Sequence, residues 1–145
     1  MSVEANKAVV LKGWEYTRLG DHAALESIYD DDVTCHGPGG ERLAGRDAVI
    51  AARASCISAF PGLSIHVEDV FGEGDRVFCR VRLEGTNTRA FMAMPATGNH
   101  VQLRWLMTVS RLEAGRVVEE WSVFDRMDFF AQLGAPQPER EAVPH

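Results

Sequence analysis

Three ionisable side chains of this sequence could carry acid–base chemistry: His36, Glu120 and Asp125. The two carboxylates belong to the stretch VVEEWSVFDRMDFFAQLG at 117–134, where a strand-like pattern gives way to a helix-like one. A positioned carboxylate can remove a proton from carbon, and a histidine exchanges protons near neutral pH. These residue types indicate proton transfer, provided that the fold brings at least one of them into a pocket.

Each of the three residues also has a structural interpretation. Asp125 is either an acid buried beside tryptophans, with a raised pKa, or the N-cap of the final helix. Glu120 is either a general base or a strand residue that meets solvent or an arginine. His36, which precedes the loop GPGG, is either a proton carrier or a structural group. We favour the N-cap for Asp125, so that any catalytic carboxylate of this stretch is Glu120.

A hairpin must position Glu120. The turn EAG at 113–115 joins two strand-like segments and sets a register that places Thr108 opposite Ser122. Because side chains alternate along strands, the pair presents two faces. The mixed polar and apolar face, which suits a ligand pocket, comprises Arg104, Leu106, Thr108, Ser110, Glu120, Ser122 and Phe124. The apolar face, which suits a core or a subunit contact, comprises Trp105, Met107, Val109, Trp121, Val123 and Asp125.

Helix-like segments come first in the chain. An apolar stripe predicts a helix over 3–19, with Ser2 as N-cap and Gly20 as its end. A second, short helix is expected from Asp21 through Tyr29, and an Ala-rich third helix over 46–60 ends at Pro61 and Gly62. On the first helix, Trp14 and Tyr16 are either core residues or aromatic pocket lining.

Strand-like segments follow, at 33–36, 63–71, 76–85, 100–113 and 116–124, and a short helix after Asp125 stops at Gly134. This order predicts an α+β fold: a cone-shaped, curved antiparallel sheet packed against three N-terminal helices, with a short C-terminal helix. A cone of this kind encloses a pocket for a small molecule. We expect one domain over 1–135 and a flexible, Pro-rich and charged tail over 136–145.

Composition narrows the class of protein. The 145 residues carry a net charge of −6 with basic residues scattered singly, which opposes nucleic-acid and membrane partners. No run of apolar residues is long enough for a membrane span. Three cysteines without a CxxC pair, and no signal-peptide layout, indicate the reducing cytoplasm. Zinc-like spacing is also missing, so we expect no metal site.

The chain resembles the SnoaL-like polyketide cyclase family of the nuclear transport factor 2-like superfamily. The resemblance runs over roughly 5–135 and is carried by GDHAALESIYDDDVTCHGP, GRDAVIAA, AFPGLSIHVEDVFGEGDRVFCRVRLEGTNT, MPATGNHV and GRVVEEWSVFDRMDFFAQLG. It implies the α+β cone, a pocket inside it, chemistry without metal or organic cofactor, and a homodimer or tetramer formed through the sheet.

The resemblance also shows a departure. The catalytic aspartate of the family falls on Ser122, the histidine two residues before it on Glu120, and the histidine of the neighbouring strand on Thr108. We therefore expect Glu120 to take over proton transfer with His36, while Arg104, Thr108 and Ser122 place carbonyl oxygens. Leu106, Phe124, Tyr16 and Trp14 would shape the cavity. The alternative is a binding or accessory protein that keeps the cone and has lost catalysis.

Overall fold

The helices begin and end where local signals direct them. The computed structural model describes residues 2–136 and contains three α-helices: α1 (Val3–Leu19), α2 (Arg46–Ala59) and α3 (Arg126–Leu133). Ser2 caps α1 by accepting the Ala5 N–H, and Gly20 ends it in the left-handed conformation at φ 69°. Gly134 ends α3 in the same way. The predicted second helix over 21–29 is wrong: only the 3₁₀ turn η1 (Ala24–Ser27) forms, and Tyr29 already begins a strand.

Six strands form one sheet in the order β2-β1-β6-β5-β4-β3. Their bounds are β1 (Tyr29–His36), β2 (Arg42–Ala44), β3 (Ser64–Glu73), β4 (Arg76–Thr86), β5 (His100–Glu113) and β6 (Arg116–Val123). The predicted α+β class is confirmed, but the sheet is mixed, because β1 runs parallel to β6. Sequence analysis also missed β2, which pairs with the end of β1.

The hairpin register agrees with the prediction in its central part. Thr108 lies opposite Ser122 and Ser110 opposite Glu120. Near the start of β5 the alternation breaks, since Leu106 faces Val81 but Leu103 faces Leu83. The strand thus carries one extra residue there, a bulge that exposes both Arg104 and Trp105.

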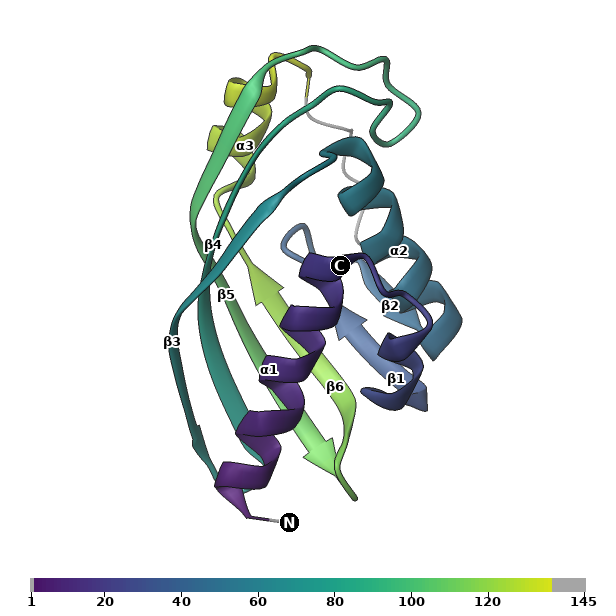
Figure 1. Ribbon diagram of the computed structural model, residues 1–145, viewed down its shortest axis with the longest axis vertical. Coiled ribbons are helices and arrows are strands. Elements are labelled where there is room, and N and C mark those ends of the chain that lie inside the picture. Colours follow the sequence, from purple (N-terminus) through teal and green to yellow (C-terminus); the bar gives the residue numbers. More distant parts are fainter. Residues whose placement is uncertain (1, 137–145) are drawn as a thin grey trace, which may run out of the picture.

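The helices cover one side of the curved sheet (Figure 1). There, α1 packs on β3 and β4, while α2 packs on β1 and β2. The main core lies between these layers and includes Trp14, Leu25, Tyr29 and Val81. A smaller aromatic cluster at the other end of β5 joins Phe60, at the end of α2, to Phe129 and Phe130 of α3. Between the two clusters the layers leave room for a pocket.

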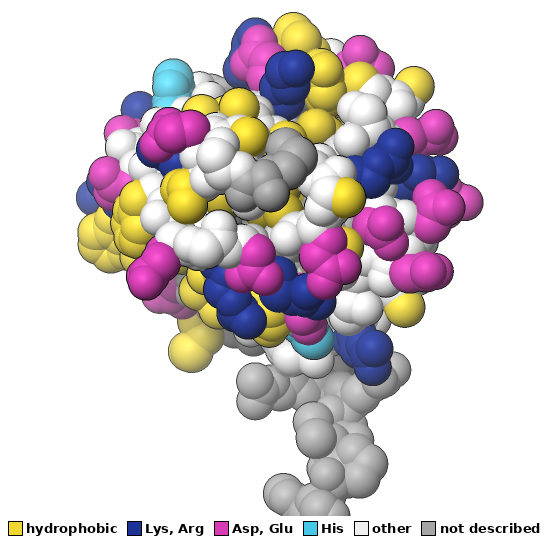
Figure 2. Space-filling model, turned by 90° about the horizontal axis from the view of Figure 1, so that it is seen from below, with side chains coloured by type: hydrophobic (Ala, Val, Ile, Leu, Met, Phe, Trp, Pro, Cys, Tyr) yellow, Lys and Arg dark blue, Asp and Glu magenta, His cyan; other side chains and the backbone are white. Residues whose placement is uncertain are grey.

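Charges are mixed on the face drawn in Figure 2, where acidic and basic side chains lie interspersed. None of the helices within residues 2–136 is long and apolar enough to cross a membrane. The expected flexible tail falls on residues that, beyond Pro136, lie outside the described part of the chain.

Candidate active site

A pocket of about 350 Å³ lies between the helices and the inner face of the sheet. Most of its wall is apolar, with Leu106 on β5, Phe124 after β6 and the aromatic rings of α3. Polar groups gather where α1, α2, β1, β5 and β6 meet, and they include Thr17, Cys35, Arg53, Cys56, Thr108, Glu120 and Ser122. Four further charged or titratable side chains also line the pocket: His36, Glu41, Glu84 and Arg126. An apolar cavity with a few convergent polar groups is the usual form of a small-molecule site.

An ion pair occupies the polar end of the pocket. Arg53 on α2 donates from Nη2 to Oε1 of Glu120 at 3.0 Å. The other carboxylate oxygen of Glu120 accepts a hydrogen bond from the Ser110 hydroxyl, also at 3.0 Å. The side chains of Arg53 and Glu120 are only 18% and 13% exposed. A charged pair this well covered is costly to desolvate, so the hydrogen bonds that satisfy it matter for its stability.

Arg53 is held from several sides. Its Nη1 donates to Thr17 Oγ1 at 2.9 Å, and the Thr17 hydroxyl in turn donates to the Gly13 carbonyl. The guanidinium lies 4.9 Å from the ring centre of Trp14 and 5.4 Å from that of Tyr29, within cation–π range. Burial disfavours the charge of Arg53, but the neighbouring Tyr29 and Glu120 outweigh it and raise the pKa of the guanidinium. The group is therefore a fixed cation.

The cysteines beside the pair are neutral thiols. Cys35 lies opposite Glu120 across β1 and β6, and burial, together with that carboxylate, raises its pKa to about 12. The pKa of Cys56 is also raised, because the groups packed around its sulfur keep water away from it, although the residue as a whole is exposed. A thiol with a raised pKa is a poor nucleophile. Within residues 2–136, moreover, no group of three or more His, Cys, Asp and Glu side chains gathers as a metal site would require.

Several of the predicted site residues do meet in this pocket: Trp14, Leu106, Thr108, Glu120, Ser122 and Phe124 line it. Tyr16 does not, because it is half-buried and packs against the main core. Thr108 and Ser122 thus border the same cavity as Glu120.

His36 is paired with Glu119, a carboxylate of the outer face of the sheet. It borders the pocket at the end of β1, but its imidazole Nε2 lies 2.8 Å from Oε2 of Glu119, and its ring stacks on Trp121. Glu119 also accepts from Arg111, and the hydrogen bond with His36 is the main cause of its lowered pKa. His36 therefore pairs with Glu119 rather than with Glu120, and this pairing gives it no contact with the proposed base.

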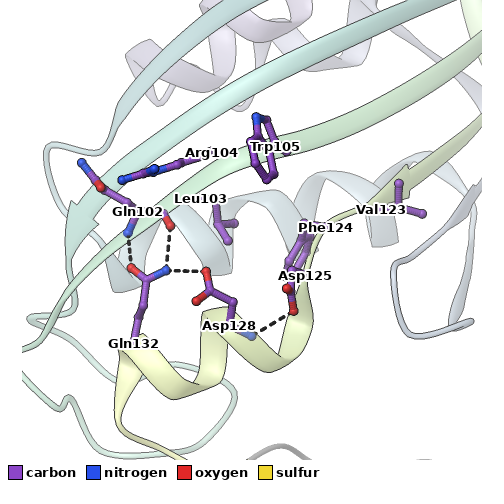
Figure 3. A pocket seen from close by; sticks show the side chains of 9 residues that line it. All are labelled: Gln102, Leu103, Arg104, Trp105, Val123, Phe124, Asp125, Asp128 and Gln132. Carbon is purple, nitrogen blue, oxygen red and sulfur yellow. Dashed lines mark hydrogen bonds between the residues drawn. The ribbon is translucent and has the colours of Figure 1, made fainter.

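Arg104 and Asp125 lie in a separate groove of about 680 Å³ beside α3 (Figure 3). The bulge in β5 turns Arg104 away from the interior, which overturns the strict alternation assumed for it. Asp125 is exposed and accepts the Asp128 N–H at 3.0 Å, as an N-cap does. The interpretation of Asp125 as an acid buried beside tryptophans is therefore wrong, because its side chain is exposed. The groove's other carboxylate, Asp128, accepts from Gln132 (Figure 3).

Sequence analysis missed Arg53. It belongs to the Ala-rich run RDAVIAARASCISA of α2, in which an arginine looks like a solvent-facing residue. One signal was available: Arg53 and Val49 are four residues apart, and thus on the same side of the helix as a buried position.

The chain matches the family model described as SnoaL-like polyketide cyclase over residues 8–133. It belongs to this family. Among curated proteins, none matches the chain. Solved structures do. IdmH from Streptomyces antibioticus, assigned as a polyketide cyclase, shares 27% identity over 90% of this chain and 99% of its own, with a TM-score of 0.76.

Two further structures show how widely the fold is used. A SnoaL-like polyketide cyclase assigned in Jannaschia sp. CCS1 shares 24% identity over 92% of this chain and 94% of its own, with a TM-score of 0.83. AclR from Streptomyces galilaeus, assigned as a hydroxylase, shares 24% identity over 92% of this chain and 98% of its own, with a TM-score of 0.80. At this identity the likeness shows the fold, and the chemistry must be argued from the site.

Proposed function

We propose that this protein is an acid–base enzyme that cyclises or isomerises a largely apolar, polyketide-like molecule in the inner pocket, with Glu120 as general base. One observation carries the proposal: the Glu120 carboxylate, 13% exposed, borders a cavity whose wall is otherwise mostly apolar. Membership of the family supports a cyclase- or isomerase-like role. The apolar wall favours a substrate with few charges.

The chemistry follows from the bonds that Glu120 makes. Each carboxylate oxygen has one protein partner, Arg53 or Ser110, and keeps a second acceptor site. Glu120 can therefore take a proton from a carbon next to a carbonyl group, leaving an enolate. That enolate either attacks a second carbonyl, which closes a ring and leaves an alkoxide that regains the proton from Glu120, or it regains that proton at another carbon, which isomerises the substrate. The hydroxyls of Thr108 and Ser122 are placed to bind substrate oxygens. Neither reaction needs an oxidant or a reductant, because substrate and product have the same net oxidation level, and we propose a reaction without cofactor.

The experiment uses substitutions on opposite faces of β6. A panel of apolar β-dicarbonyl and polyketide-like compounds is incubated with protein in heavy water, and mass spectrometry and NMR follow deuterium uptake and product. For a compound that reacts, Glu120→Gln should lower turnover by about 100-fold or more. The matched control Glu119→Gln, on the other face, should not lower it. Unchanged turnover in folded Glu120→Gln would overturn the proposal.

A second function is favoured by one observation. Ser122 and Thr108 stand where the family resemblance has aspartate and histidine, so the chain fits a binding or accessory protein that has lost catalysis. Such a protein would release every bound compound with its mass and structure unchanged. A rearranged or deuterated product that depends on the protein would exclude this alternative.

We also propose a homodimer or tetramer formed through the outer face of the sheet. Trp105, Val123 and Phe71 are exposed there, at 65%, 57% and 59%. Large apolar side chains gathered on one face often mark a subunit contact. A cytoplasmic location remains part of the proposal, supported by three free cysteines.

A further inference from the structure

The charges of Arg53 and Glu120 neutralise each other at the polar end of the pocket only while Glu120 is ionised. With Glu120 ionised, its negative charge matches the positive charge of Arg53 at 3.0 Å. Once Glu120 accepts a proton it becomes neutral, and Arg53 is left as a well-covered cation without its partner. An unpaired charge in such a place is costly. The reaction is favoured if the negative charge that Glu120 loses appears on an atom that Arg53 can also reach.

We propose that Arg53 is a second catalytic residue, which binds the carbonyl oxygen of a neutral, enolisable substrate and receives the enolate charge as Glu120 takes the proton. This inference rests on the proposed function. It assigns the substrate class at the reacting end: an uncharged ketone, β-dicarbonyl or thioester that can place negative charge on oxygen. A carboxylate at that position would instead meet the like charge of Glu120.

The step balances without any further reactant. The C–H bond next to the carbonyl breaks, and its proton forms an O–H bond on Glu120. The electron pair of the C–H bond moves into the enolate and onto its oxygen, beside Arg53. The site holds one positive and one negative charge both before and after the transfer. Donors that are already in place where negative charge develops are a strong source of catalysis, because nothing must reorganise during the step.

The geometry of Arg53 suits this role. Within residues 2–136, its hydrogen bonds to Thr17 and Glu120 use two of the five N–H donors of a guanidinium. Arg53 borders the pocket, and its 18% exposed side chain leaves part of the group open to a ligand. The rings of Trp14 and Tyr29 restrict its movement. Arg53 is thus already oriented before a substrate arrives.

The competing explanation is that Arg53 only neutralises Glu120. The two roles predict different behaviour once Glu120 has taken the proton and is neutral. The variant Glu120→Gln imitates this state, because glutamine is neutral and has a similar shape. In this variant a catalytic Arg53 should attract an anionic oxygen into the pocket. An Arg53 that cannot reach the oxygen of a bound ligand should show no preference between a phenolate and the neutral phenol.

The probe is 4-nitrophenol, an aromatic molecule whose phenolate resembles an enolate and is distinguished from the phenol by its absorbance. Titrations over pH give the apparent pKa of the bound probe. In Glu120→Gln we expect it to be lower than in Glu120→Gln with Arg53→Gln by one unit or more, a tenfold preference for the phenolate. The neutral analogue 4-nitroanisole should bind both proteins alike. Adding Arg46→Met to Glu120→Gln is the matched control, since this α2 arginine pairs with Asp31 instead.

Equal pKa values for the bound probe with and without Arg53, or the same change caused by Arg46→Met, would overturn the inference. If the Arg53→Gln protein fails to fold, Arg53→Met, whose side chain can pack on Trp14, removes the same charge and decides in the same way. The readout needs no turnover. A retained phenolate preference with full turnover in Glu120→Gln would therefore refute Glu120 as the base, while leaving Arg53 as an anion-binding group.

Discussion

Glu119 and Glu120 are neighbours in the sequence, and the sheet gives them opposite surroundings. Glu119 meets His36 and Arg111 on the outer face, while Glu120 meets Arg53 and Ser110 beside the pocket. The two carboxylates have the same chemistry, so only strand alternation separates them. At the residue scale, the proposed function depends on this alternation and on an arginine supplied by a helix far away in sequence.

Asp125 should contribute to stability and not to the proposed turnover. Its side chain caps α3 and lies in the outer groove, away from the inner pocket (Figure 3). Asp125→Ala should lower the free energy of unfolding by about 1 kcal/mol, measured by urea denaturation. Asp125→Asn keeps an acceptor and should cost less. Lost turnover in a folded Asp125→Asn protein would contradict this and return the acid–base role to Asp125.

The face on which a residue lies can be predicted from sequence where the strand that carries it is regular. The register from the EAG turn correctly opposes Thr108 to Ser122, and both border the pocket with Glu120. It fails at Arg104, because a bulge adds a residue to β5 without any local signal. The role of Arg53 was not predicted for another reason. Its partner Glu120 is distant in sequence, and the pattern of residues within α2 cannot reveal a contact with another element.

At the element scale, the β5–β6 hairpin determines which carboxylate faces the pocket. Its two-residue turn joins the paired residues Glu113 and Arg116. Ala114 and Gly115 occupy the turn at φ 49° and 77°. Positive φ at both positions is typical of a type I′ turn, which favours Asn followed by Gly. The turn residues thus fix the register, although Ala114 is strained.

Replacing Ala114 should therefore stabilise the protein. Asparagine enters the left-handed region more easily than alanine, so Ala114→Asn should raise the free energy of unfolding by roughly 0.5–1 kcal/mol. Gly115→Ala, the control in the same turn, should lower it. Urea denaturation with an unchanged slope measures both. A destabilised Ala114→Asn protein would show that the strain at this turn is relieved in another way.

Elements follow from sequence when their ends carry local signals. Ser2, Gly20 and Gly134 delimit helices where capping chemistry predicts. The short strand β2 and the parallel pairing of β1 with β6 have no such signal, since both depend on contacts between segments far apart in the chain. The predicted helix over 21–29 fails because Tyr29, fully buried, belongs to the sheet.

At the scale of the whole molecule, the two faces of the sheet carry the two roles proposed for it, substrate binding and subunit contact. Its inner face holds the pocket and the Arg53–Glu120 pair. The helices α1 and α2 cover this face (Figure 1). Its outer face bears Trp105 and Val123, both more than half exposed. A subunit contact on the outer face would leave the pocket accessible to substrate. The bulge in β5 contributes to this division, because it turns Trp105 outward while Leu103 and Leu106 line the pocket.

The proposed contact between subunits can be tested by introducing one charged side chain into it. Trp105 is 65% exposed, and a large aromatic side chain of this kind commonly anchors an interface. We expect light scattering after size exclusion to give the mass of a dimer or tetramer for the wild type. Trp105→Glu would bury a charge in the contact and should weaken association by more than about tenfold.

The control for this test is Leu19→Glu. Leu19 is similarly exposed, at 60%, but it ends α1, which packs on the inner side of the sheet. This substitution should leave the mass in solution unchanged, while both proteins keep the wild-type melting temperature within a few degrees. A wild type that stays monomeric at all concentrations would refute the oligomer. An assembly that tolerates Trp105→Glu but separates with Leu19→Glu would place the contact on the helical side instead.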